Sequence, residues 1–170
     1  MDACKIRRRA DLEGLRALER RMPTLMEIRG YAGRPINRFD LVFRIKTPVD
    51  RRFPKRRREV CRVSLDIPCR YPFEPAQIEV VDQIYNPHVF PSGLLCAGWR
   101  QETNWTLAEL TIRAMRIIAL DPSIIASGHA ANWDAANWYE KIRWSGIFPT
   151  AYIPIDESLT HGEISFRAIV

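Results

Sequence analysis

The alternation of apolar and polar residues predicts a helix at the start of the chain, followed by a run of strands. Leu15, Leu18 and Met22 recur at helical spacing within residues 6–22, and charged residues fill most of the other positions. Pro23 is expected to end this helix, because proline has no N–H to continue the helical hydrogen bonds. Glycines and a proline then break the chain before the first strand.

Three segments alternate between apolar and polar residues with the period of two that is typical of β-strands. They span residues 39–46, 59–67 and 77–81. Cys61 lies on the apolar face of the second segment, so we expect it to be a structural cysteine in the core. The arginine-rich stretch at residues 50–58 contains a proline and is expected to be a loop.

Helical periodicity returns in the second half of the chain. Thr106 and Glu109 have the spacing of a capping box in front of an apolar stripe, which predicts a helix that ends at Asp121 and Pro122. A further helix is expected to begin at about residue 132 or 134 and to end at residue 142. One helix, three strands, an irregular loop and two helices indicate an α+β fold with an antiparallel β-meander.

Length and composition are typical of one globular domain, since the chain has 170 residues of which 46% are hydrophobic. No stretch approaches the roughly 20 apolar residues of a membrane span, and the first residues do not resemble a secretory signal. We therefore expect a cytoplasmic protein. The four cysteines and three histidines match no zinc-binding spacing, so we expect reduced thiols, no metal and no cofactor.

Positive charge is concentrated in the first part of the chain. Residues 1–62 hold 19 Lys and Arg against 8 Asp and Glu, whereas residues 63–170 hold 7 against 12. Two basic clusters, at residues 7–9 and 51–58, account for much of this excess. A solvated surface and a docking site for an acidic partner both explain such clusters. No aromatic residues flank the second cluster, which argues against specific nucleic-acid recognition.

The segment YNPHVFPSGLLCAGW contains the candidate chemistry. Cys96 lies in an irregular loop rich in proline and glycine, unlike Cys61, and is the better candidate for a nucleophile. A buried, inert cysteine is the alternative. The amide of Asn86 and the imidazole of His88 can each donate a hydrogen bond to an oxyanion. Alternatively, both side chains only shape the loop.

Several motifs in this region, in their order along the chain, resemble those of ubiquitin-conjugating enzymes. Pro87 and Cys96 resemble the proline of the family's His-Pro-Asn tripeptide and its thioester-forming cysteine. The other matching motifs are Tyr71-Pro72-Phe73-x-Pro75, Trp105, Leu110-Thr111-Ile112, Asp121-Pro122 and Ala135-Ala136-x-x-Tyr139. The resemblance covers approximately residues 6–142, and it implies the family's fold of an N-terminal helix, an antiparallel meander, an active-site loop and C-terminal helices.

Two departures from the family pattern affect the candidate site. The tripeptide is Asn-Pro-His, so the positions of Asn86 and His88 are exchanged. The loop after Pro122 contains no acid before Asp134, although the family often has one there, facing the incoming lysine. His129 and Asp134 are possible substitutes, or simply a surface residue and a first-turn helix charge. These departures and the tail after residue 143 resemble bacterial relatives that are encoded with a ubiquitin-like protein and an activating enzyme.

The resemblance implies an acyl-transfer enzyme with a cysteine thioester intermediate. Cys96 would accept the C-terminus of a ubiquitin-like protein from an activating enzyme and pass it to a lysine of a target protein. By position, His88 would serve the oxyanion and Asn86 would stabilise the loop, which makes these three the candidate catalytic residues.

Other parts of the chain receive roles from the same resemblance. Arg7, Arg8 and Arg9 lie where the family docks its activating enzyme. Residues 1–142 would form the conjugating-enzyme-like domain, and residues 143–170 an extension packed on it. We expect neither a membrane nor a nucleic acid as a partner. The alternative function is a catalytically inactive module that binds a ubiquitin-like protein or scaffolds its complex.

Overall fold

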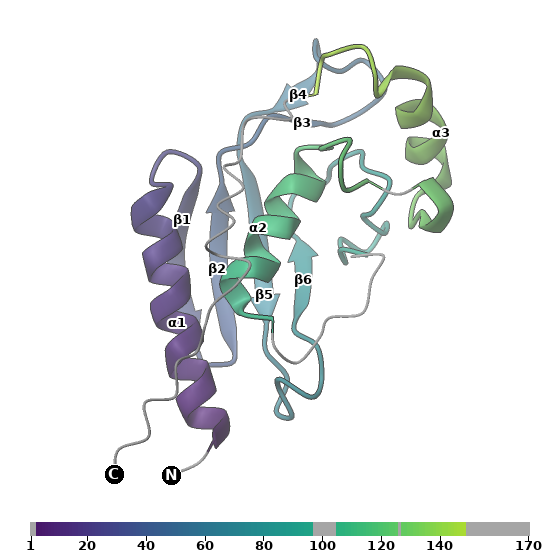
Figure 1. Cartoon of the computed structure of the whole chain (residues 1–170). Coiled ribbons are helices and arrows are strands. Elements are labelled where there is room, and N and C mark those ends of the chain that lie inside the picture. The colour runs from purple at the N-terminus through teal and green to yellow at the C-terminus, as the bar shows by residue number, and fades with distance from the viewer. Residues whose placement is uncertain (1–2, 97–104, 126, 149–170) are drawn as a thin grey trace.

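A four-stranded antiparallel sheet forms the centre of the molecule. The computed structural model describes residues 3–96, 105–125 and 127–148 (Figure 1). Each strand pairs with its predecessor in the sheet, as expected for a meander, in the order β1-β2-β5-β6. The four strands are β1 (Met26–Ala32), β2 (Arg38–Phe43), β5 (Cys61–Asp66) and β6 (Gln77–Val80).

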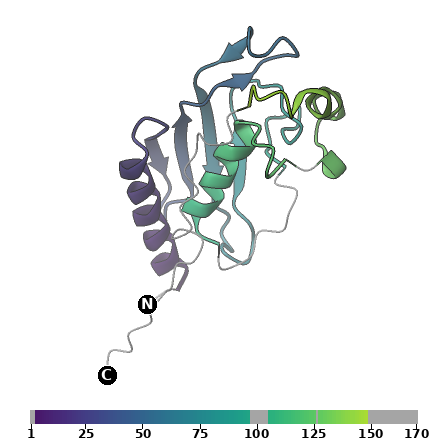
Figure 2. The ribbon, with the colours of Figure 1, turned by 45° about the horizontal axis from the view of Figure 1, so that its top comes forward.

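Three helices and a small hairpin complete the described fold. Helix α2 (Leu107–Ile118) crosses one face of the sheet, and α1 (Ala3–Arg21) lies beside it at the β1 edge (Figures 1 and 2). Helix α3 (Trp133–Ile142) and a hairpin of β3 (Thr47–Pro48) and β4 (Arg57–Arg58) lie beyond one end of the sheet. This arrangement confirms the predicted α+β fold.

Strand β1 was not predicted from the sequence. It is an edge strand, and a register shift between Ile28 and Gly30 interrupts its pairing with β2. Only Met26 of this strand is fully buried, so the regular alternation that reveals the other strands is missing. Pairing with β2, and not the local pattern, therefore makes this segment a strand.

The predicted apolar faces meet between the sheet and the helices. Leu15 and Leu18 of α1 are buried against this core, together with Phe39 of β2 and Ile117 of α2. Cys61 is also fully buried, and burial raises the pKa of its thiol to about 12. A thiol with so high a pKa stays protonated at neutral pH, which confirms Cys61 as a structural cysteine.

The first residues after α3 return to the hairpin. Phe148 stacks on Phe53 of the β3–β4 loop with ring centroids 5.6 Å apart, and it also contacts the rings of Trp138 and Tyr139. This aromatic cluster packs the beginning of the predicted 143–170 extension on the domain. Residues 149–170 lie outside the described residues.

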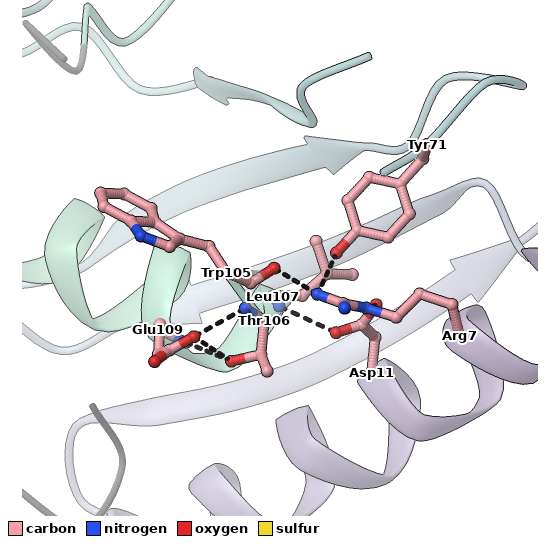
Figure 3. Close-up of polar contacts among 7 residues, drawn as sticks. All are labelled: Arg7, Asp11, Tyr71, Trp105, Thr106, Leu107 and Glu109. Atoms are coloured by element: carbon pink, nitrogen blue, oxygen red, sulfur yellow. Dashed lines mark hydrogen bonds and ion pairs between the residues drawn. The ribbon is translucent and has the colours of Figure 1, made fainter. Parts of the chain in front are cut away.

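A buried carboxylate joins α1 to the start of α2 (Figure 3). Asp11 accepts a hydrogen bond from the N–H of Leu107 at 3.0 Å and forms an ion pair with Arg7 at 2.9 Å. Arg7 also donates to the carbonyl of Trp105 and, at 3.5 Å, to the hydroxyl of Tyr71. The negative charge of Asp11 lies at a helix N-terminus, where the helix dipole stabilises it.

The capping box predicted at the same helix terminus is confirmed. The backbone N–H of Thr106 donates to the Glu109 carboxylate at 2.7 Å, and the N–H of Glu109 donates to the Thr106 hydroxyl at 3.2 Å. The start of α2 is therefore held both by its own side chains and by α1.

The contacts of α1 distinguish Arg7, Arg8 and Arg9, the three residues predicted to dock an activating enzyme. Arg8 is only 6% exposed and donates to the carbonyls of Ile36 and Pro68, each at 2.6 Å. Arg7 is occupied in the cluster around Asp11. Both side chains satisfy backbone carbonyls within the fold, whereas the side chain of Arg9 projects into solvent.

Replacing Asp11 by alanine should destabilise the protein strongly. The variant leaves the Arg7 charge without its buried partner and the Leu107 N–H without an acceptor. We expect the free energy of unfolding to fall by about 3 kcal/mol, measured by urea denaturation. The control is Glu13→Ala, which breaks only the exposed pair with Arg9 and should cost at most about 0.5 kcal/mol. Equal losses for the two variants would contradict this account.

Candidate functional site

The loop that carries Cys96 is held against β6 by a short backbone pairing. The N–H of Leu95 donates to the carbonyl of Ile78, and the N–H of Val80 donates to the carbonyl of Gly93, each at 2.8 Å. Gly93 has a φ of +93°, and a Cβ atom there would lie 2.6 Å from the carbonyl oxygen of Val80. Only glycine fits so close to the strand, so this position fixes the path of the chain toward Cys96.

Asn86 connects this loop to the end of α2. Its side chain is fully buried, and its Nδ2 donates to the carbonyl of Ile117 at 2.8 Å. Its Oδ1 accepts a hydrogen bond from the backbone N–H of His88 at 2.9 Å. One amide therefore satisfies both a helix carbonyl and the tight turn around Pro87, which are the contacts that a loop-stabilising residue needs.

His88 lies beneath the surface next to Cys96. Its side chain is 2% exposed, and its backbone carbonyl accepts a hydrogen bond from the N–H of Cys96 at 2.7 Å. The backbone of His88 thus sets the position of the cysteine.

Cys96 differs from the other three thiols in its position. All four cysteines are reduced. Cys4 lies on α1, and Cys61 is buried in the sheet. Cys69 is exposed in the loop between β5 and β6. Cys96 alone combines partial exposure with a loop that is fixed by the tripeptide.

The segment before α3 packs directly on the tripeptide. The carbonyl of Pro87 accepts hydrogen bonds from the N–H groups of Ala131 and Asn132, at 2.8 and 3.0 Å. Asn132 then caps α3 by accepting from the N–H of Ala135 at 3.1 Å. His129, which the sequence offered as a substitute base, lies in the preceding turn and is exposed.

Asp134 contacts the residue that precedes the tripeptide. It accepts a hydrogen bond from the hydroxyl of Tyr85 at 2.7 Å and pairs with Arg51. The Tyr85 and Arg51 hydrogen bonds lower the pKa of Asp134 below its usual value, so it is a carboxylate at neutral pH. Tyr85 immediately precedes Asn86, so this acid is tied to the start of the loop.

Sequence reasoning did not identify Tyr85 and Arg51 as part of the site. Arg51 and Asp134 are 83 residues apart in the chain, so no periodic pattern relates them. The sequence offered one sign of this contact, because Tyr85, which has a hydroxyl group, directly precedes the tripeptide. A cleft of about 540 Å³ opens beside this tyrosine, and Phe90, Ser92 and Asn132 contribute to its lining.

The fold and this loop agree with a comparison to known protein families. The family model described as ubiquitin-conjugating enzyme matches residues 33–142. The chain belongs to the ubiquitin-conjugating enzyme family. Members of this family normally transfer ubiquitin-like proteins through a cysteine thioester. The matched span contains Asn86, His88, Cys96 and Asp134, whereas α1 and its arginines precede it.

Among solved structures, this chain is similar to the human ubiquitin-conjugating enzyme E2 G1. The two share 18% sequence identity with a TM-score of 0.45, over 66% of this chain and 96% of the human chain. A comparison with curated protein sequences found no match. Within the part of the chain that the structure describes, no helix is both long enough and apolar enough to cross a membrane.

Removing the Asn86 side chain should loosen the whole loop. In Asn86→Ala the carbonyl of Ile117 and the N–H of His88 both lose a buried partner, and we expect a loss of about 2–4 kcal/mol in the free energy of unfolding. Thermal unfolding followed by circular dichroism measures the change. Asn37→Ala, at an exposed asparagine, is the matched control and should differ little from the wild type. Indistinguishable midpoints for the two variants would exclude this role of Asn86.

Proposed function

We propose that this protein is an active conjugating enzyme in which Cys96 carries a ubiquitin-like protein as a thioester. The observation that supports this most directly is the position of Cys96. Its backbone N–H is bound to the carbonyl of His88, in a loop that Asn86 fixes to α2. A nucleophile that must meet two successive partners benefits from such a fixed position.

The proposed reaction has two acyl-transfer steps. The Cys96 thiolate attacks the thioester carbonyl on the activating enzyme, and the tetrahedral oxyanion collapses with release of that enzyme's thiolate. A lysine amine of the target then attacks the new thioester, loses a proton and forms an amide while the Cys96 thiolate leaves. Each step passes through an oxyanion, whose stabilisation by a hydrogen-bond donor is the usual device for lowering the barrier.

His88 is the proposed donor to this oxyanion, and Asn86 the residue that holds the loop. The backbone carbonyl of His88 binds the N–H of Cys96, so the two residues lie side by side, and an imidazole N–H can donate a hydrogen bond. The Asn86 amide donates to the carbonyl of Ile117 and accepts from the N–H of His88, so both its nitrogen and its oxygen are used to hold the loop. Although the two residue types are exchanged relative to the family's tripeptide, one side chain still holds the loop and the other can still donate to the oxyanion.

Asp134 is proposed to act by charge and position, and not by accepting a proton. Its lowered pKa makes it a weak base, because general bases work best with a pKa near the working pH. Arg9 is the remaining candidate for docking the activating enzyme, since it is the exposed member of its cluster.

The first test is thioester formation. The full chain is mixed with ATP and with an activating enzyme and a ubiquitin-like protein taken from neighbouring genes. On a non-reducing gel we expect an adduct that thiol reagents remove and that Cys96→Ala does not form. Cys69→Ala, at an exposed cysteine, is the control and should still form it. Measurable binding without any adduct would favour the inactive module, and an adduct in Cys96→Ala would exclude Cys96.

The second test separates the two roles proposed around Pro87. Purified thioester of the His88→Asn variant should transfer to free lysine at nearly the wild-type rate, because asparagine restores an uncharged donor. His88→Ala removes the donor and should slow transfer by about 10²–10³-fold, with circular dichroism confirming that both variants fold. Equal slowing of the two variants would show that His88 acts through its own shape or proton chemistry.

A further inference from the structure

The β3–β4 hairpin carries an unusual excess of positive charge. Residues 50–58 hold six Lys and Arg residues and one Asp. That acid, Asp50, is shared by Arg52 and Arg56 at 2.8 and 2.9 Å. One carboxylate therefore serves two guanidinium groups, and positive charge remains for an external partner.

A second carboxylate is shared by two arginines where the hairpin meets the sheet. Asp82, in the loop after β6, pairs with Arg62 at 2.8 Å and with Arg58 at 3.6 Å. The pairing with Arg62 lowers the pKa of Asp82, so this acid is charged at neutral pH and still does not balance two arginines. Glu59 also pairs with Arg57 at 2.6 Å, and Asp134 pairs with Arg51. Four acids in total face the seven basic residues between positions 51 and 62, so a net positive charge remains on the hairpin.

A depression in this surface gathers the cations. It has a volume of about 400 Å³ and is lined by Val49 and by four consecutive residues, Lys55, Arg56, Arg57 and Arg58. Guanidinium groups bind carboxylates through two parallel hydrogen bonds. The depression thus offers donors suited to the carboxylates of Asp and Glu side chains.

The hairpin is fixed to the domain. Phe53 stacks on Phe148, the indole N–H of Trp138 donates to the carbonyl of Arg51 at 3.2 Å, and the Thr47 hydroxyl donates to the carbonyl of Ile118 at 3.0 Å. A fixed hairpin loses little conformational freedom when a partner binds, which favours affinity.

The hairpin also lies next to the candidate active-site loop. The N–H of Tyr85 donates to the carbonyl of Pro48 at 2.8 Å, and Arg51 donates to the Tyr85 hydroxyl at 3.0 Å. Tyr85 is three residues before His88, a span of at most about 10 Å. Hairpin and α3 occupy the same end of the sheet (Figures 1 and 2). Tyr85 therefore connects the base of the hairpin to the candidate loop.

We propose that the depression at Lys55–Arg58 binds the carboxylates of an acidic segment in the target protein, near the acceptor lysine. The identity of that lysine rests on the proposed function. A nucleic acid fits less well, since no aromatic side chain lines the depression for base stacking. In addition, residues 63–170 carry more Asp and Glu than Lys and Arg, which disfavours a long polyanion.

The test measures peptide binding to the full chain by fluorescence anisotropy, with no thioester required. One labelled peptide has a lysine followed by glutamates, and its partner has glutamines in their place. We expect the glutamate peptide to bind at least about tenfold more tightly, with the preference weakening as salt is added. The double variant Lys55→Glu and Arg57→Glu should lose this preference. The control, Lys5→Glu and Arg20→Glu on α1, has the same change in net charge and should retain it.

Three results would overturn the proposal. These are equal binding of the two peptides, equal loss in the hairpin and α1 variants, or tighter binding of a single-stranded oligonucleotide of the same charge at the same salt concentration. Circular dichroism confirms that each variant is folded. If the peptide preference is present but no thioester forms at Cys96, the proposed function fails and the anion site stands. If the thioester forms without a peptide preference, the proposed function stands and the anion site fails.

Discussion

The fixed geometry of the candidate active site depends on one buried amide. Asn86 donates to the last turn of α2 and accepts from the backbone of His88, whose carbonyl in turn binds the N–H of Cys96. A buried amide whose nitrogen and oxygen both have partners permits few alternative arrangements, because each alternative leaves one of them without a partner in a low-dielectric interior. The packing of the core therefore determines where the thiol lies.

Helix α2 connects this amide to the rest of the fold. Its first turn is bound by Asp11 of α1, and its last turn accepts the hydrogen bond from Asn86. The tripeptide is bound from the other side by the segment before α3, through the carbonyl of Pro87. The end of α2 and the segment before α3 thus meet at one loop, and this is a general way to hold a reactive group on a rigid scaffold.

The sequence predicts best where one local pattern determines the structure. The apolar stripe of α2 and the capping box of Thr106 and Glu109 predicted that helix, and the alternation of apolar and polar residues, with Val42 as an exception, predicted β2, β5 and β6. The bulged edge strand β1 has no such alternation. The burial of Arg8 was not predictable either, since an arginine that satisfies two backbone carbonyls looks identical in sequence to one in solvent. Tertiary contacts decide such cases.

The central claim is that the acyl group is carried on Cys96, in the loop that Asn86 holds. Mass spectrometry of the full chain after reaction with the activating enzyme, ATP and the ubiquitin-like protein tests it most directly. We predict a single adduct in which the mass added to the chain equals that of the ubiquitin-like protein minus water, mapped by peptide analysis at acidic pH to Cys96. An adduct on Cys4 or Cys69, or none while the activating enzyme itself is loaded, would contradict this claim.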